Sequence, residues 1–249
     1  MSALPTRKLE AFRYADIDAL NDVWLTLAAP ERIVIAAQQN LQQIWLPNDD
    51  DVQVRRVEMT LHAGASASIF ALNAASRYGR IEIDVTLHDG ANFELDAANI
   101  GGGQSTLEIV TTLRHVEPNA TSRQTVRSVL GGKAVGSYLG KVAVSPGADG
   151  TDSVQSVKAM LLDRGAIANA KPELEIYADD VKCAHGATVG QLEADELFYL
   201  KSRGLSEAAA RNLLTYAFAA QVIERIPVKS IVERLEKAVL EQTQGRKDA

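Results

Sequence analysis

The sequence predicts a mainly β protein that ends in a small helical domain. From residue 31 to about 178, apolar and polar residues alternate, for example from Ile81 to His88, as in half-buried strands. Turn-forming residues interrupt this alternation at intervals of about 11 to 18 residues. From about Leu192 the apolar period becomes helical. We therefore expect an N-terminal arm (1–30), a β body (31–190), a helical domain (191–244) and a disordered tail (245–249).

Composition limits the classes of partner. The 249-residue chain has a net charge of −6, and its Lys and Arg residues are scattered, which argues against nucleic acid. No apolar run approaches the roughly 20 residues of a membrane helix, and the first residues lack the apolar core of a secretory signal. The single cysteine excludes an internal disulfide and fits a reducing compartment. We expect a cytoplasmic protein that binds neither nucleic acid nor a membrane.

The first 30 residues mix polar and apolar positions and include Pro5 and Pro30. We expect a short helix or an irregular arm in this segment. Phe12, Tyr14 and Trp24 are its large aromatic residues. We expect these side chains to anchor the arm on the β body rather than to bind a ligand.

Two architectures fit the β body: a sandwich or barrel, and a β-solenoid in which successive coils stack. Residues 63–75 and 91–100 are rich in Ala, Gly, Ser and Thr, and small side chains suit the narrow interior of a solenoid. No clean short repeat strengthens this preference. The end coil of a solenoid leaves N–H and C=O groups unpaired, so such a body is suited to pairing with another chain.

Three helices are expected after the β body. The first contains Leu197, Phe198 and Leu200 and ends at Gly204, a residue suited to the left-handed conformation of a helix end. Ser206 is a good N-cap for the second. The second has an apolar stripe of Leu213, Leu214, Ala217, Phe218, Gln221 and Val222. The third spans 228–242, after Pro227, with Ile231, Val232, Leu235 and Val239 facing inward.

Cys183 and His185 are the main candidates for chemistry. Residues two apart in a strand point to the same face, so the thiol and the imidazole can converge on one ligand. Both are good ligands for iron or zinc. One cysteine and one histidine fall short of the four ligands of a zinc or iron–sulfur centre, so a second chain would have to complete the site. The alternative is a buried structural cysteine beside a hydrogen-bonded histidine.

Other polar residues are assigned structural roles. Adjacent carboxylates in a strand point to opposite faces, so we expect Asp179 and Asp180 to lie in a turn rather than to act as an acid–base pair. His115 shares the parity of a buried face and is expected in the core, whereas His62 and His88 lie beside turns and are expected to be exposed. The glycines of 101–103 lack the context of a phosphate loop and are expected to form a turn.

Several segments resemble the SufB/SufD family of iron–sulfur assembly proteins. The resemblance is carried by KPELEIYADDVKCAHGATVGQL (171–192), LFYLKSRGLS (197–206), QSVKAMLLD (155–163), GKVAV (140–144) and FAAQVIERI (218–226). It is strong from about 135 to 226 and looser over the rest of the β body. The opening PTRKLEAFRY (5–14) and the single cysteine are most like the SufD branch. Many members have a longer N-terminal helical region than this sequence shows.

The resemblance implies a right-handed parallel β-helix with a C-terminal helical domain. It also implies a non-catalytic scaffold subunit of a SufBCD-type complex, which pairs with a SufB-like paralogue through the β-helix. His185, with Cys183 beside it, would lie at the shared interface where a nascent iron–sulfur cluster is assembled transiently, and this chain alone would hold no cofactor. The isolated chain could instead form a homodimer.

The resemblance further implies that the C-terminal helices dock a SufC-like ABC ATPase. The apolar residues expected to take part are Leu197, Phe198, Leu213, Tyr216 and Phe218. Two hypotheses from other classes stay open. One is a structural β-solenoid dimer module without metal, and the other is a Cys–His hydrolase or acyltransferase that uses Cys183 as the nucleophile.

Overall fold

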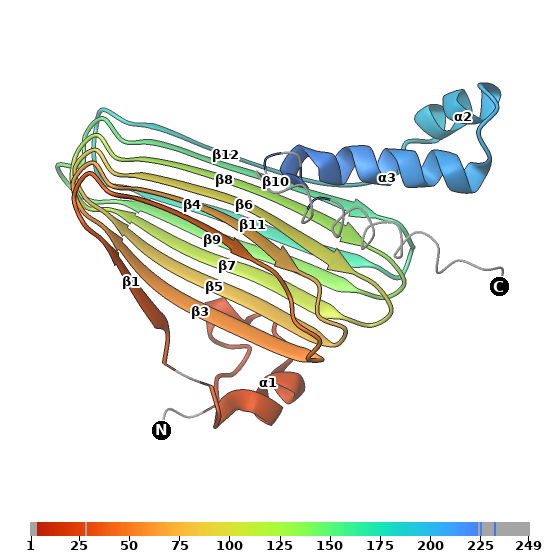
Figure 1. The fold of residues 1–249 in the computed structure, drawn as a ribbon, viewed down its shortest axis with the longest axis horizontal. Coiled ribbons are helices and arrows are strands. Elements are labelled where there is room, and N and C mark those ends of the chain that lie inside the picture. Colours follow the sequence, from red (N-terminus) through yellow and green to blue (C-terminus); the bar gives the residue numbers. More distant parts are fainter. Residues whose placement is uncertain (1–3, 28, 224, 226–231, 233–249) are drawn as a thin grey trace.

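In the computed structural model, the chain coils into a β-solenoid built from two parallel sheets (Figure 1). The structure describes residues 4–27, 29–223, 225 and 232. Sheet A contains β1 (Glu31–Ile35), β3 (Val52–Leu61), β5 (Tyr78–Leu87), β7 (Thr106–His115), β9 (Val135–Val144) and β11 (Ile167–Ile176). Sheet B contains β2 (Asn40–Trp45), β4 (Ser66–Asn73), β6 (Asn92–Gly101), β8 (Thr121–Leu130), β10 (Asp152–Leu161) and β12 (Lys182–Gln191). Consecutive strands alternate between the sheets, so each coil contributes one strand to each sheet.

Successive coils stack in register. Strand β5, for example, pairs residue by residue with β7 along its whole length. Because side chains alternate along a strand, a position that faces inward in one coil lies above an inward position of the coil before it. At the corners, Gly64 and Gly90 adopt φ values of +65° and +61°, which favour glycine. The backbone N–H of Gly64 donates to the carbonyl of Asp89 in the next coil at 2.8 Å.

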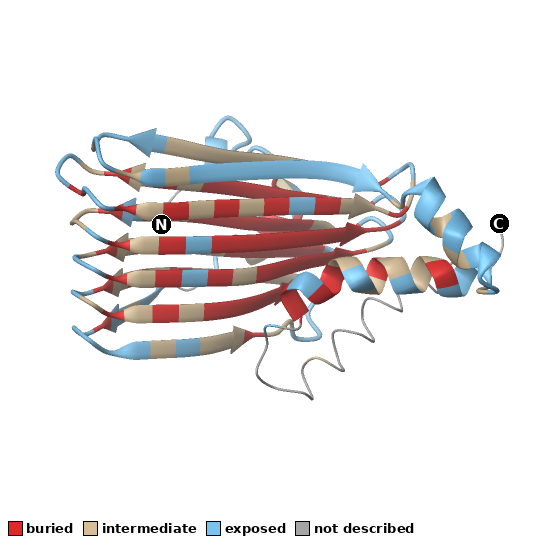
Figure 2. Ribbon diagram, turned by 90° about the horizontal axis from the view of Figure 1, so that it is seen from above, coloured by how far each residue is buried: buried red, intermediate tan, exposed pale blue. Residues whose placement is uncertain are grey.

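The space between the two sheets, here called the lumen, contains the main core. Its first coils are filled by aliphatic and aromatic side chains from both sheets, including Leu61, Ile69, Ile83, Phe93 and Leu95. Burying each such side chain stabilises the fold by about 1.5–3 kcal/mol. Figure 2 shows that the middle strands of the stack are mostly buried, whereas β12 at its edge is mostly exposed.

The N-terminal arm packs on the outer face of sheet A. It contains a short 3-10 helix (Glu10–Phe12) and α1 (Ile17–Trp24), and Asp16 caps α1 by accepting from the N–H of Ala19 at 3.0 Å. Ala19 and Leu20 are fully buried against Tyr78 of β5. Phe12 and Trp24 pack on the same cluster, which confirms their prediction as anchors.

The arm also reaches the far end of the stack. The Glu10 carboxylate accepts from Lys171 Nζ of β11 at 2.6 Å, while Asp22 accepts from Arg77 just before β5 at 2.7 Å. Both ion pairs are exposed, so each stabilises the protein only weakly. They nevertheless show that the arm extends along sheet A from the early coils to the last sheet A strand.

The C-terminal helices lie on the other side of the solenoid (Figure 1). Helix α2 (Ala194–Ser202) ends before Gly204, whose φ of +95° confirms the expected helix end. Helix α3 (Glu207–Ile223) begins after Ser206, whose Oγ accepts from the N–H of Ala209 at 3.2 Å, as expected of an N-cap. Helix α2 has no fully buried residue and projects beyond the ends of the strands.

Helix α3 is anchored on sheet B through its C-terminal half. Ala219, Val222 and Ile223 pack against an outer-face cluster made of Phe70, Leu72, Ala98, Ile100, Val129 and Leu162. Arg127 Nε donates to Gln221 Oε1 at 2.9 Å beside this cluster. The third expected helix (228–242) and the tail (245–249) lie outside the described residues, except that Val232 packs against the same cluster.

The mainly β fold with parallel coils and C-terminal helices is confirmed. The sandwich or barrel alternative was wrong, because the described strands of both sheets pair in parallel with strands of neighbouring coils. Among the described residues, no helix is long and apolar enough to cross a membrane.

Candidate functional site

Cys183 and His185 lie on β12, the last strand of sheet B. In register, Cys183 lies over Ser153 and His185 over Gln155 of β10, and both partners are buried in the lumen. The thiol and the imidazole are therefore on the lumen-facing side, as the spacing of two residues predicts. Among the described residues, no strand pairs with the opposite edge of β12, so the pair lies at the open end of the solenoid.

The two side chains differ in their surroundings. His185 is exposed, whereas Cys183 is half-buried and packs against the lumen core. Burial raises the pKa of the Cys183 thiol above its ordinary value. A thiol with a raised pKa is a poor nucleophile at neutral pH, which argues against the hydrolase hypothesis.

Beneath Cys183 the lumen contains a serine stack. Ser122, Ser153 and Cys183 occupy one register position in three successive sheet B strands. The Oγ atoms of Ser122 and Ser153 are 2.8 Å apart, and Ser122 Oγ is 3.0 Å from Nε2 of His115. Burial lowers the pKa of His115 to about 4, so this histidine is neutral at pH 7. The expected core location of His115 is confirmed.

Beneath His185 the lumen contains a glutamine stack. Gln124, Gln155 and His185 share one register position. The Tyr138 hydroxyl of sheet A crosses the lumen and lies 2.8 Å from Gln155 Oε1 and 3.2 Å from Gln124 Oε1. Thr111 Oγ1 lies 3.3 Å from the same hydroxyl. Burial raises the pKa of Tyr138, so its hydroxyl keeps its proton and donates.

The site contains few ligands for a metal. Among the described residues, no group of three or more His, Cys, Asp and Glu side chains could hold a metal ion. Asp179 and Asp180 lie in the bend between β11 and β12, where the carbonyl of Asp180 accepts from Gly150 N–H at 2.6 Å. This location agrees with the expected turn role.

The remaining sequence candidates are structural. His62 is exposed as expected, but the prediction that His88 is exposed was wrong, because His88 is half-buried. Its ring stacks on that of His62, with the two ring centroids 5.2 Å apart, and its Nδ1 lies 2.9 Å from Glu117 Oε1. His88 is covered because β3 and β5 pair in register, so that His62 and His88, the residues that follow these two strands, lie next to each other. Gly101 ends β6, and Gly102 and Gly103 lead into the turn that follows, where Gly103 has φ of +59°.

The helices expose apolar side chains away from the solenoid. Phe198 is 73% exposed, Tyr199 56% and Leu213 47%. Beside them is a groove of about 480 Å³, lined by Asp195, Glu196, Tyr199, Leu200, Leu213, Leu214 and Ala217. Half of the predicted stripe of α3 therefore faces α2 and solvent. The face that contacts sheet B contains Val222 and Phe218 of the stripe together with Ala219 and Ile223, which the stripe did not include.

The five predicted docking residues do not share one surface. Leu213 is exposed and lines the groove, Phe198 is exposed on α2 outside the groove lining, and Tyr216 is half-buried on α3. Leu197 lines a separate cavity of about 300 Å³ between α2 and the end of β10. Phe218 packs on the sheet B cluster that anchors α3, so it belongs to the attachment of the helix rather than to its free face.

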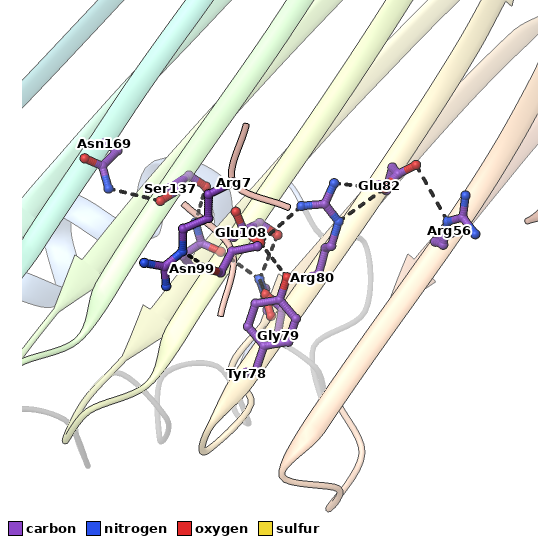
Figure 3. Close-up of polar contacts among 12 residues, drawn as sticks. Arg7, Arg56, Tyr78, Gly79, Arg80, Glu82, Asn99, Glu108, Ser137 and Asn169 are labelled. Carbon is purple, nitrogen blue, oxygen red and sulfur yellow. Dashed lines mark hydrogen bonds and ion pairs between the residues drawn. The ribbon is translucent and has the colours of Figure 1, made fainter. Parts of the chain in front are cut away.

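Sequence reasoning missed a buried ionic cluster on the outer face of sheet A (Figure 3). Arg80 and Glu108 are both fully buried; Arg80 Nη1 donates to Glu108 Oε2 at 3.1 Å, and the Tyr78 hydroxyl donates to the same oxygen at 2.6 Å. The Arg80 guanidinium also lies over the ring of Phe12, 4.3 Å from its centroid. The arm covers this cluster, and sequence alternation would have placed Arg80 and Glu108 on a solvated face.

Fold and site together define a parallel β-solenoid whose last coil carries a Cys-x-His pair on an open edge and whose helices project beyond the stack. The chain belongs to the SufBD family: the model of the SufBD core domain of the SUF system for FeS cluster assembly matches residues 28–218. Family membership inferred from the motifs is thereby confirmed.

Individual relatives point the same way. The chain is 42% identical over 129 residues to an iron–sulfur cluster assembly SufBD family protein of Synechocystis, a match that covers 52% of this chain and 28% of the relative. It is 39% identical over 116 residues to the iron–sulfur cluster assembly protein SufD of Escherichia coli, covering 47% of this chain and 27% of SufD. It is 40% identical over 117 residues to the chloroplastic protein ABCI7 of Arabidopsis thaliana, covering 46% and 24%. The chain thus spans about a quarter of the length of these curated relatives.

Proposed function

We propose that this chain is a SufD-type, non-catalytic scaffold subunit for iron–sulfur cluster assembly. The observation that carries the proposal is the placement of Cys183 and His185 on the open edge of the last coil of a SufBD-family solenoid. A thiolate and an imidazole are ligands for iron, but two ligands do not hold a cluster. A partner chain that extends the edge would supply the others, and the nascent cluster is then a transient cargo of the shared site.

The last coil, formed by β11 and β12, is suited to pairing with a SufB-like paralogue. Both strands end their sheets, so their free N–H and C=O groups can pair with strands of another chain. Large apolar side chains are exposed there: Ile167 is 51% exposed, Tyr177 66% and Val189 48%. Covering these side chains would stabilise a complex.

The groove between α2 and α3 is the proposed docking surface for a SufC-like ABC ATPase. Tyr199 and Leu213 line it and are exposed, Phe198 adds exposed apolar area on α2, and aromatic residues are frequent anchors of protein interfaces. The helices contact the solenoid through the C-terminal half of α3, so a partner bound to α2 is held away from the cluster site.

The site is tested by His185→Ala in the chain co-expressed with SufB-like and SufC-like partners. We expect the purified complex to lose most of its iron and sulfide while keeping its composition, because the imidazole acts on the cargo and not on pairing. Thr188→Ala is the matched control, since Thr188 is also exposed on β12 but has the opposite parity. Wild-type iron and sulfide content in the His185→Ala complex would contradict the role of His185.

The helical surface is tested by Phe198→Ser and Leu213→Ser. We expect both variants to weaken copurification of the ATPase without changing the stability of this chain, because both side chains are largely exposed. Val34→Ser is the control, because Val34 is 67% exposed on β1, at the other end of the stack. Equal ATPase recovery from all three variants would rule out this groove.

A further inference from the structure

The lumen changes character toward its open end. Between β7 and β12, inward positions are occupied by polar side chains that are at most 1% exposed: Thr111, His115, Ser122, Gln124, Ser153 and Gln155. They are joined by Tyr138, which is also 1% exposed. Hydrogen bonds link this set into two stacks. Cys183 and His185 occupy the next register position of each stack.

Tyr138 and Gln155 form a brace across the lumen. The Tyr138 hydroxyl has one proton, and the shorter distance of 2.8 Å assigns it to Gln155 Oε1. Gln155 Nε2 in turn donates to the backbone carbonyl of Glu173 in β11 at 3.3 Å. The brace therefore connects β9, β10 and β11, and it ends directly beneath His185 of β12.

The backbone provides the space that the brace needs. A Cβ at Gly140 would lie 2.0 Å from the Tyr138 hydroxyl and 2.5 Å from Gln155 Oε1. Gly140 faces the lumen between Thr111 and Pro172 in register, so any other residue there would displace the hydroxyl. The glycine thus allows a large polar side chain to cross to the opposite sheet.

Stability alone does not account for this arrangement. Replacing both partners of a buried hydrogen bond by apolar groups of the same shape is nearly neutral, and leaving one polar group unpaired is costly. The network includes such unpaired atoms, Nε2 of Gln124 and Nδ1 of His115. Apolar side chains like those of the earlier coils would fill the same space without this cost.

We propose that the Tyr138–Gln155 brace positions His185 by fixing the two edge strands of the last coil and the Gln155 side chain that lies below His185 in register. Tyr138 and Gln155 are positioning residues, because they act through β11 and through His185 rather than on the cargo. The reason for positioning rests on the proposed function, since a shared site requires its ligand in a fixed place when the partner arrives. The positioning itself is a property of this chain and can be measured without partner or cluster.

The test uses NMR of the full chain with labelled histidine, in which three-bond couplings of the His185 ring report its χ1 rotamers. We expect one dominant rotamer in the wild type and averaged couplings in Gln155→Met and Tyr138→Phe. Amide exchange in β11 and β12 should be about fivefold to tenfold faster in both variants, whereas β3 and β5 should be unchanged. Two variants are used so that the result does not depend on the folding of either one.

Tyr78→Phe is the matched control. Tyr78 is fully buried and donates to a buried oxygen, like Tyr138, but it lies on the outer face of sheet A. The Tyr78→Phe variant should have a lower free energy of unfolding, as Tyr138→Phe does, but unchanged His185 couplings. Averaged couplings in the wild type, or identical couplings in the wild type and both brace variants, would overturn the proposal. Either result would leave the role of His185 in cluster assembly to its own test.

Discussion

The coils formed by β3 to β6 and those formed by β7 to β12 share one backbone geometry but enclose different lumens. The first set is filled by side chains such as Ile69, Ile83 and Leu95. Its buried polar side chains that face the lumen, Asn73 and Asn99, hydrogen-bond to each other at one corner. The second set places hydroxyls, amides and a neutral imidazole in the centre of the lumen.

The comparison separates two tasks within one stack. A solenoid is stabilised by its coils and by the contacts between neighbouring coils. The apolar coils supply most of this stabilisation, because burial of apolar surface is the dominant favourable term in folding. The polar coils support the open edge, and we expect mutations there to change the site more than the stability of the fold.

The largest effect is expected in the apolar lumen. Leu95→Ala should lower the free energy of unfolding by about 2–5 kcal/mol, because Leu95 is 1% exposed and its loss leaves a cavity. Urea unfolding measures the change, and Leu25→Ala, at a position 78% exposed, should change it by less than about 0.5 kcal/mol. A loss below about 1 kcal/mol for Leu95→Ala would show that the early coils are not the main source of stability.

Acid should act through the polar lumen. The pKa of His115 falls from 6.5 to about 4 in the folded protein, so the unfolded chain binds a proton more readily. The free energy of unfolding is therefore unaffected by His115 above about pH 6.5 and falls as the pH drops toward about 4. The total loss is about 3 kcal/mol. Unfolding free energies of wild type and His115→Gln across this range measure it. An equal acid dependence in both would contradict the assignment.

A smaller effect is expected from the pair Tyr138 and Gln155. Tyr138→Phe should cost about 1–3 kcal/mol, because it leaves Gln155 Oε1 buried without its donor. The double variant Tyr138→Phe/Gln155→Met should cost much less than the sum of the two single changes, since Gln155 Oε1, the acceptor that Tyr138→Phe leaves unpaired, is then absent. A double-mutant cycle from urea unfolding gives the coupling free energy between the two side chains. Strictly additive changes in the free energy of unfolding would show that Tyr138 and Gln155 are not coupled.

The smallest effect concerns the thiol at the end of the serine stack. Because burial raises the pKa of Cys183, its alkylation by iodoacetamide at neutral pH should be slower than that of an exposed peptide cysteine. The rate should rise with pH beyond the range in which the peptide has reached its plateau. A peptide of residues 179–187 provides the reference. If the alkylation rate of the protein reached its plateau at a lower pH than that of the peptide, the pKa of Cys183 would be lowered and not raised.

The strands were predictable where one face is apolar. Ile81, Ile83, Val85 and Leu87 alternate with polar residues, and β5 lies where that pattern places it. The Cys183–His185 pair was likewise predictable, because the spacing of two residues fixes a common face. Both predictions depend only on contacts that are local in the chain.

The polar lumen was not predictable. In β8, polar residues occupy both parities, so Gln124 gives no sign of facing inward. The contact between Tyr138 and Gln155 depends on register across the lumen, which strand periodicity does not specify. The orientation of α3 was not predictable for a related reason: apolar residues lie both on the side that packs on sheet B and on the side that lines the groove, and the periodicity does not distinguish them.

The ion pair between Glu10 and Lys171 has a consequence for the order of events during synthesis. Its partners are 161 residues apart in the chain. At about 5–20 residues per second, roughly 8 to 32 seconds separate the appearance of Glu10 from that of Lys171 at the ribosome. Helix α1 can settle on β5 well before then, so the arm closes in two stages. Glu10 is thus synthesised early but completes its contact late, and a nascent chain stalled before β11 would present a half-closed arm to proteases and chaperones.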